Sequence, residues 1–107
     1  MRRGDVYWVD FDPARGGEIR KRRPAVIVGN NAATRVQNRV QVVPLTSNTA
    51  TVRHWEALVW IGGTSSKALA DQIRTVAKER LTDHIGTLGP RDLLAVEQAL
   101  RVQLDLP

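Results

Sequence analysis

The sequence of 107 residues contains no cysteine and no apolar run that approaches the roughly 20 residues needed to span a bilayer. The lack of cysteine excludes a disulfide framework and a thiolate metal site, and it is compatible with a reducing compartment. The N-terminus also lacks the apolar core of a signal peptide. These absences favour a cytoplasmic protein without a membrane segment.

Motifs of several enzyme classes are missing as well. There is no Gly-rich phosphate loop with a following Lys-Ser/Thr, and no cysteine nucleophile. The two histidines, His54 and His84, stand thirty positions apart, which is not the spacing of a metal-ligand pair. We expect both to be surface or capping residues rather than catalysts. The sequence therefore predicts neither a metal site nor a cofactor.

Acidic residues are scarce in the first half of the chain. Residues 1–54 hold ten Lys or Arg against four Asp or Glu, whereas residues 55–107 hold six against seven. Thirteen of the sixteen cations are Arg, whose planar guanidinium binds phosphate in a two-pronged manner and keeps its charge at any ordinary pH. The net charge of +5 therefore points to a nucleic acid, bound mainly by the first half of the chain.

The length fits one domain, 1–107, and a hydrophobic content of 42% predicts a globular fold with a single core. Alternating or continuous apolar segments separated by turn residues predict short strands. A helical turn is expected within residues 31–38, and residues 81–85 do not distinguish strand from helix. The expected strands are Asp5–Phe11, Pro24–Val28, Val40–Leu45, Trp55–Ile61, Ser66–Leu69 and Gln72–Ala77.

A helix is expected at the end of the chain. Gly89 and Pro90 are typical of a helix start, and Leu88 before them pairs with Leu93 as a hydrophobic staple. Four apolar residues recur at helical spacing and are expected to face the core: Leu93, Val96, Leu100 and Leu104. The predicted fold is mainly β (α+β), a small antiparallel β-barrel that carries a C-terminal α-helix.

The densest cluster of charge lies in the predicted loop between the first two strands. Arg20, Lys21, Arg22 and Arg23 follow Glu18 within a few residues of two glycines. Four like charges in sequence repel one another, so the cluster favours folding little unless a polyanion neutralises it. The loop is therefore predicted to be a phosphate-binding site.

RNA carries its own nucleophile, which makes cleavage without a metal chemically reasonable. The 2′-hydroxyl attacks the adjacent phosphate when one group takes its proton, another stabilises the added charge and a third protonates the leaving 5′-oxygen. Glu18 is a candidate base and Arg23 a candidate for charge stabilisation. Thr46 and Ser47, at a predicted strand end, are candidate donors to a phosphate oxygen. In the alternative interpretation Arg23 pairs with Glu18, Glu18 organises the loop and Thr46 satisfies a turn.

Four blocks of sequence resemble the MazF/PemK/Kid toxins. They occur in the same order at compatible spacing, and the resemblance covers nearly the whole chain. The blocks are Arg3-Gly4-Asp5-Val6-Tyr7-Trp8, Gly16-Gly17-Glu18 with Arg23-Pro24-Ala25-Val26, Pro44-Leu45-Thr46-Ser47, and Leu69-Ala70-Asp71-Gln72-Ile73-Arg74-Thr75 followed by Arg80-Leu81.

The resemblance implies an SH3-like or CcdB-like barrel that acts as a homodimer. It also implies a metal-independent, sequence-selective endoribonuclease that leaves a 2′,3′-cyclic phosphate and a 5′-hydroxyl, and that a cognate antitoxin holds inactive. By position, Arg23 and Thr46 correspond to the catalytic Arg and hydroxyl of the family. Glu18 matches an acid found in part of the family, and Gln72 lies in a block that lines the RNA groove of relatives.

The loop departs from the family pattern, because Ile19, Arg20, Lys21 and Arg22 stand where many relatives have Gln and small or neutral residues. Cationic residues add phosphate contacts without selecting bases, so the cleavage sequence is not evident from the chain.

Trp55 is a candidate for base stacking, whereas Trp8 and Trp60 are expected in the core or on a dimer surface. The residues expected to contact single-stranded RNA are Gly17, Ile19, Arg20, Lys21, Arg22, Ser47, Asn48, Arg53, His54, Trp55 and Gln72.

Two other functions remain compatible with the sequence. The first is a gyrase-poisoning toxin with the related CcdB fold, although such a binder does not need the pair of Arg23 and Thr46. The second is a barrel that binds RNA without cleaving it, which the altered loop keeps open. Cleavage of naked RNA separates the first interpretation from both alternatives.

Overall fold

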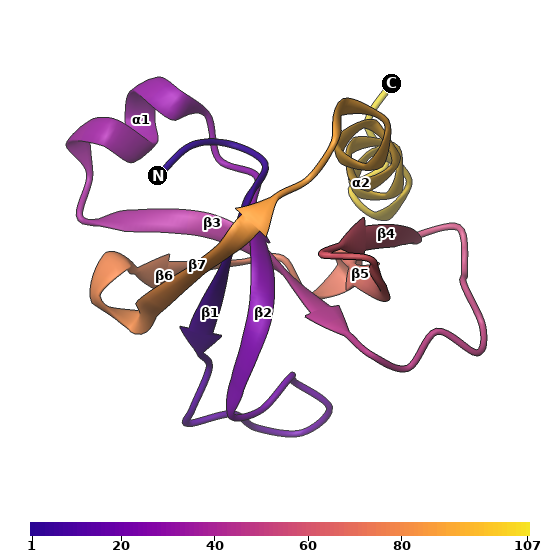
Figure 1. Ribbon diagram of the computed structural model, residues 1–107, viewed down its shortest axis with the longest axis horizontal. Helices are drawn as coiled ribbons and strands as arrows, with labels where there is room; N and C mark the ends of the chain where they lie inside the picture. Colours follow the sequence, from indigo (N-terminus) through magenta and orange to yellow (C-terminus); the bar gives the residue numbers. More distant parts are fainter.

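The computed structural model describes all residues, 1–107, and contains seven strands and two α-helices (Figure 1). The helices are α1 (Asn31–Val36) and α2 (Pro90–Gln103), and 3-10 turns occupy Ala70–Gln72 and Lys78–Arg80. The strands are β1 (Asp5–Asp10), β2 (Arg22–Ile27), β3 (Arg39–Thr46), β4 (Glu56–Ile61), β5 (Thr64–Leu69), β6 (Arg74–Ala77) and β7 (Leu81–Thr87). The expected fold class, an antiparallel β structure with a C-terminal helix, is confirmed.

Every strand pair is antiparallel, and β3 is the central strand, because it pairs with three other strands. The order is β4-β5-β3-β2-β1-β7, with β6 paired to β3 outside this path. β3 pairs with β6 through residues 39–42, with β2 through 42–44 and with β5 through 45–46. The sheet curls far enough that a Cβ atom on Gly86 of β7 would lie 3.0 Å from Ile61 of β4. The two outer strands thus approach each other as in a partly closed barrel.

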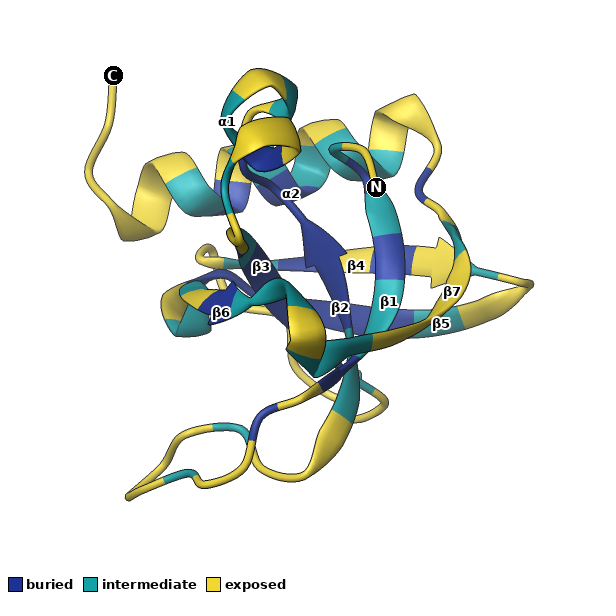
Figure 2. Cartoon of the chain, turned by 90° about the vertical axis from the view of Figure 1, so that its left-hand side faces the viewer, coloured by how far each residue is buried: buried dark blue, intermediate teal, exposed yellow.

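The apolar interior is divided in two by the central strands, so the expectation of a single core is wrong in detail. One cluster of 12 buried residues includes Val26 and Val43 and is covered by α2. A second cluster of 7, which includes Phe11 and Ile27, fills the curled side of the sheet. Neighbouring residues of β2 and β3 alternate between the two clusters, which explains why these strands are apolar without interruption. Figure 2 shows both strands buried through the centre of the molecule.

α2 packs close to the start of β1 because a glycine leaves room for it. Gly4 has a φ of 96°, in the region that favours glycine, and its Cβ would lie 3.3 Å from the Leu93 side chain. Leu93 and Val96 pack in the helix-facing cluster, as expected. Leu104, however, is 49% exposed, because the helix ends at Gln103 and the chain leaves the sheet there.

Neither helix has the length and apolar character required to cross a membrane.

Several boundaries differ from the sequence-based expectations, and one of them matters for function. β2 begins at Arg22 rather than Pro24, because Asp10 and Val9 of β1 pair with Arg22 and Arg23 in register. Arg23 is therefore held on a strand and not in a loop. Residues 81–87 form a strand, whereas Gln72 ends a 3-10 turn instead of beginning a strand.

The start of β1 carries a carboxylate whose charged form is stabilised by the fold. Burial raises the pKa of Asp5, but hydrogen bonds from the Arg2 N–H and the Thr87 hydroxyl, both at 2.8 Å, outweigh burial. His84, with Nε2 3.6 Å from Oδ1, and the N-terminal charge add to this effect. The pKa of Asp5 is therefore lower than its ordinary value of 3.8.

Because the folded-state pKa of Asp5 is depressed, its contribution to stability is present above the unfolded-state pKa and is lost as the pH falls through the folded-state pKa. We expect Asp5→Asn to lower the free energy of unfolding by about 1–2 kcal/mol at pH 7, and the difference from wild type to shrink below about pH 4. Urea unfolding at pH 7 and pH 3 measures this. Asp105→Asn, near the exposed C-terminus, is the control; an Asp5→Asn deficit that is equal at both pH values would contradict the linkage.

Candidate active site

The pairing of β2 with β3 brings Arg23 and Thr46 together. The register pairs Ile27 with Val42 and Ala25 with Pro44, and its continuation by two residues sets Arg23 opposite Thr46. Both residues line one cleft of about 250 Å³. The other residues that line it are Trp8, Arg22, Pro24, Leu45, Ser47 and Ser66. Two cations and three hydroxyl groups thus share a small cleft at the end of two buried strands.

The Arg23 guanidinium is half-buried and largely without partners. Its Nε donates to the carbonyl of Arg20 at 3.3 Å, its two Nη groups make no hydrogen bond within the protein, and no carboxylate lies within ion-pair distance. The alternative in which Arg23 pairs with Glu18 is therefore wrong for this structure. The Nη groups remain able to bind a phosphate in a two-pronged manner.

The Thr46 hydroxyl makes one structural hydrogen bond and keeps its proton free for another. Its Oγ1 accepts a hydrogen bond from the Asn48 N–H at 3.3 Å, so it does satisfy the turn that follows β3. The hydroxyl proton is not used by that bond, because the oxygen is the acceptor. Thr46, Ser47 and Ser66 therefore present donors to the same cleft as Arg23.

Arg22 differs from its neighbours in the basic cluster. Its guanidinium lies 4.8 Å from the centre of the Trp8 ring, and Nη2 contacts Asp83 at 2.5 Å and the Thr82 hydroxyl at 2.8 Å. The side chain thereby reaches across β1 to β7 and stabilises the fold. RNA binding by Arg22 stays a prediction, but its charge is already paired. Core placement of Trp8 is wrong, since the ring forms a wall of the cleft beneath Arg22.

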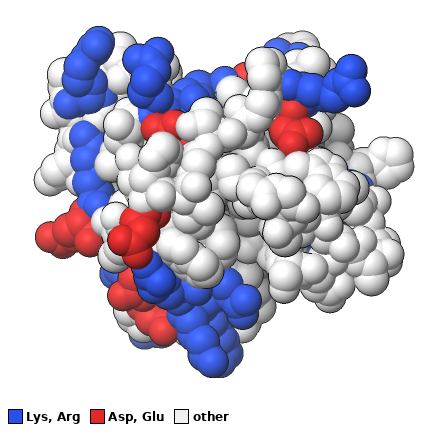
Figure 3. Space-filling model, viewed as in Figure 1, with Lys and Arg blue, Asp and Glu red and all other residues white.

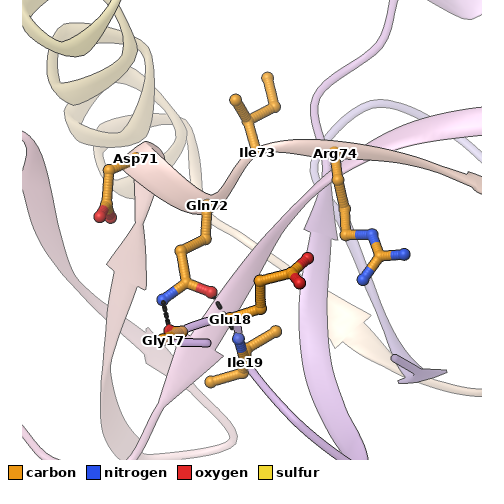
Figure 4. Close-up of a pocket in the computed structure, with 7 residues that line it drawn as sticks. All are labelled: Gly17, Glu18, Ile19, Asp71, Gln72, Ile73 and Arg74. Atoms are coloured by element: carbon orange, nitrogen blue, oxygen red, sulfur yellow. Dashed lines mark hydrogen bonds between the residues drawn. The ribbon is translucent and has the colours of Figure 1, made fainter. Parts of the chain in front are cut away.

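A second pocket, of about 480 Å³, separates the loop after β1 from the start of β6 (Figure 4). Gln72 bridges it: its Oε1 accepts from the Ile19 N–H at 2.6 Å and its Nε2 donates to the Gly17 carbonyl at 3.4 Å. Glu18 lines this pocket and not the Arg23 cleft, and its carboxylate accepts from the Arg15 N–H at 2.8 Å. The structure thus gives Glu18 the contacts of a loop organiser.

The segment between β3 and β4 is held to the barrel by a lysine that also forms a buried ion pair between β4 and β5. Lys67 and Glu56 lie 3.4 Å apart with side chains 9% and 7% exposed, and Lys67 also donates to the Thr51 carbonyl at 2.8 Å. Four predicted RNA contacts on or next to this segment are exposed and line neither pocket: Asn48, Arg53, His54 and Trp55. Trp60 is 55% exposed, so its placement in the core is wrong.

Positive charge gathers at the tip formed by the loop after β1. Figure 3 shows Lys and Arg side chains over the lower part of the molecule, where Figure 1 places this loop. Arg20, Lys21 and Arg23 form no ion pair. Arg20 and Lys21 are exposed and line neither pocket. No group of three His, Cys, Asp or Glu side chains is arranged as metal ligands.

Among the residues with hydroxyl or charged side chains that line these pockets, three were not predicted as site residues. Ser66 enters the Arg23 cleft from β5, and Asp71 and Arg74 line the second pocket beside Gln72. Asp71 and Arg74 belong to a block that carries the family resemblance, which was the available signal. Ser66 is a small residue in a short strand, and only the pairing of β3 with β5 reveals its position.

Comparison with known proteins decides the family. A family model described as PemK-like, MazF-like toxin of type II toxin-antitoxin systems matches residues 2–104. The chain belongs to this family. It is 42% identical to the endoribonuclease MazF9 of Mycobacterium tuberculosis, covering 99% of this chain and 98% of that one. It is 32% identical to the endoribonuclease EndoA of Bacillus subtilis, covering 99% and 96%. At the level of the family, the expectation of an endoribonuclease is confirmed.

Solved structures of the MazF family share the fold over the whole chain. An endoribonuclease from a mycobacterial species, solved in complex with its cognate antitoxin, superposes with a TM-score of 0.84 at 29% identity and covers 100% of this chain and 97% of its own. MazF from Deinococcus radiodurans gives a TM-score of 0.86 at 26% identity, with 98% and 96% covered. The curled sheet and C-terminal helix described above are thus the architecture of this MazF family.

Proposed function

We propose that this MazF-family chain is a metal-independent, sequence-selective endoribonuclease toxin that cleaves single-stranded RNA. One observation carries the proposal: an arginine with two unpaired Nη groups and a threonine hydroxyl line the same cleft at the ends of β2 and β3. The family assignment supplies the substrate class, since the relatives are named endoribonucleases.

The proposed reaction uses the 2′-hydroxyl of RNA as nucleophile. Its oxygen forms a bond to phosphorus, the bond from phosphorus to the 5′-oxygen breaks, and the products are a 2′,3′-cyclic phosphate and a 5′-hydroxyl. Negative charge rises on the non-bridging oxygens as the phosphorane forms. Arg23 binds these oxygens through its Nη groups, and the hydroxyls of Thr46 and Ser47 donate to them, which lowers the barrier because the donors are held in place beforehand.

Proton transfer is the less constrained part of the mechanism. The cleft holds no carboxylate or imidazole among its lining residues, so water or a shifted Glu18 must take the proton of the 2′-hydroxyl. An Arg with a pKa above about 12 donates a proton only to a strongly basic group, such as an unprotonated 5′-oxygen. Arg23 therefore acts first through its charge, and it protonates the leaving oxygen only if that oxygen departs as an alkoxide.

The partners follow from the charge and from the relatives. The unpaired cations Arg20 and Lys21 bind the phosphates that flank the cleft, which makes RNA binding sensitive to salt. A mycobacterial relative was solved with its cognate antitoxin, and we infer that an antitoxin with an acidic segment covers the same cations here. We further infer a homodimer in the cytoplasm, where exposed apolar side chains such as Leu58 and Trp60 are available for burial against a twin subunit.

Arg23→Ala should abolish RNA cleavage while leaving the fold intact. We expect a loss of at least a hundredfold, the scale for removing a preorganised charge-stabilising donor, and little change in melting temperature, because the side chain makes one weak hydrogen bond. Primer extension on a long RNA, with and without EDTA, measures cleavage, metal dependence and sequence preference together. Arg39→Ala, an exposed arginine of β3, is the control.

Cleavage that stops in EDTA would overturn the metal-independent mechanism. Full activity of the Arg23→Ala variant would remove Arg23 from the reaction. If wild-type protein binds RNA in a salt-sensitive manner without cutting it, the non-catalytic barrel is the correct interpretation. DNA breaks that require gyrase, without cleavage of naked RNA, would identify a gyrase poison.

Glu18→Gln separates a base from a loop organiser. The carboxamide still accepts the hydrogen bond from the Arg15 N–H, so the loop should keep its shape. We expect the single-turnover cleavage rate to fall less than about tenfold, whereas loss of a general base costs about 10²- to 10⁴-fold. A loss of that size, together with disappearance of the acidic limb of the rate against pH, would show that Glu18 moves the proton.

A further inference from the structure

In the loop between β1 and β2, residues 13–19 are hydrogen-bonded to the rest of the molecule through one side chain. Residues 13–19 make two hydrogen bonds to residues outside the loop, and both go to the terminal amide of Gln72. Figure 4 shows this side chain pointing from the 3-10 turn before β6 onto the main chain at Gly17 and Ile19. Other contacts of this stretch are internal, such as the bonds between Arg15 and Glu18.

The main-chain groups that hold Gln72 match the edge of a nucleobase. The Ile19 N–H and the Gly17 carbonyl converge on one carboxamide, with a donor facing its oxygen and an acceptor facing its nitrogen. Each nucleobase displays an acceptor next to an N–H donor on its Watson–Crick edge, and unstacked bases of single-stranded RNA are read on these edges. The Gln72 amide thus has the hydrogen-bonding pattern of a base edge.

We propose that the Gly17 carbonyl and the Ile19 N–H form a base-reading site that Gln72 occupies in the free protein. A nucleobase next to the scissile phosphate displaces the Gln72 amide and takes over both hydrogen bonds, an inference that rests on the proposed RNA cleavage. The ligand is the Watson–Crick edge of one unstacked base. Gln72 is in this view a placeholder that a base must displace. Because every base carries this donor and acceptor pair, selection among bases falls to the other polar groups of the pocket, Glu18 and Asp71.

The surrounding pocket has room and partners for a base. Its volume is about 480 Å³, and Ile19 and Ile73 contribute apolar surface among its polar lining. Glu18 and Asp71 add hydrogen-bond acceptors to this lining. Arg74 also lines the pocket, although its guanidinium lies 5.5 Å from the centre of the Phe11 ring and its Nη1 is buried without a hydrogen-bond partner.

The site is linked to the Arg23 cleft through the main chain. Ile19 is followed by Arg20, whose carbonyl accepts the single hydrogen bond of Arg23. Displacement of Gln72 therefore acts on the same short segment that orients the candidate catalytic group. A base that seats correctly at Gly17 and Ile19 fixes that segment, so base selection and the position of Arg23 are coupled, as in induced fit.

The experiment follows side-chain amide signals by NMR in the full-length protein. The ligands are four 2′-O-methyl hexanucleotides, of A, of C, of U and of alternating G and U, which cannot be cleaved because the nucleophile is blocked. A hexamer of abasic tetrahydrofuran units supplies phosphates without bases. We expect one or two base-containing ligands to shift the Gln72 NH₂ signals to those of a free amide while the Ile19 N–H stays hydrogen-bonded. The Gln41 NH₂ group, which donates to Thr75 on β6 and lines neither pocket, is the internal control.

Gln72→Ala removes the competitor and should leave binding of the responding hexanucleotide unchanged or tighter by up to about fivefold, the factor for one net hydrogen bond. Gln41→Ala should change nothing. Binding that leaves the Gln72 signals in place, equal displacement by the abasic hexamer, or uniform weakening by Gln72→Ala would each overturn the proposal. Cleavage with Gln72 still in place contradicts this inference alone, whereas displacement without any cleavage of RNA contradicts the proposed catalysis alone.

Discussion

The antiparallel pairing of β2 with β3 is the interaction on which the candidate site depends. Ala25 and Pro44 are partners in this ladder, and the same register, continued to the strand ends, sets Arg23 against Thr46. A slip by one residue would turn every side chain of one strand to the opposite face of the sheet. Such a slip is costly here, because both strands bury alternate residues in two separate apolar clusters. Burial of valine side chains therefore fixes the position of the chemistry.

The site uses rigid and movable parts for different tasks. Arg23 and Thr46 stand at the ends of buried strands, which keeps their separation constant. Residues 13–19 of the loop before Arg23 are hydrogen-bonded to the rest of the molecule through Gln72. Arg22 is tied to Asp83 and stacked on Trp8, so one cation of the basic cluster serves the fold. The remaining cations of the cluster, Arg20, Lys21 and Arg23, form no ion pair, and this unbalanced charge is what a phosphate chain would neutralise.

Much of the fold and part of the site could be predicted from the sequence. Alternating apolar residues located β1, β-favouring side chains located β4, and the helix start at Pro90 carried clear local signals. The proximity of Arg23 to Thr46 came from family resemblance and not from local pattern. The continuous apolar run at 24–28 predicted a buried strand, but its division between two clusters was missed because it depends on the curl of the sheet. The ion pair of Arg22 with Asp83 and the hydrogen bonds of Gln72 to Gly17 and Ile19 were missed because each joins residues more than fifty positions apart. Local patterns carry no information about such partners.

A double-mutant cycle between Arg23 and Thr46 tests most directly whether the two act as one unit on RNA. Single-turnover cleavage would be compared for wild type, Arg23→Ala, Thr46→Val and the double variant. We expect the double variant to cleave about as slowly as Arg23→Ala alone, because residues that stabilise the same transition state are strongly non-additive. If the two losses simply multiply, as they should for groups in separate sites, Arg23 and Thr46 do not share a phosphate and the proposed catalytic cleft is wrong.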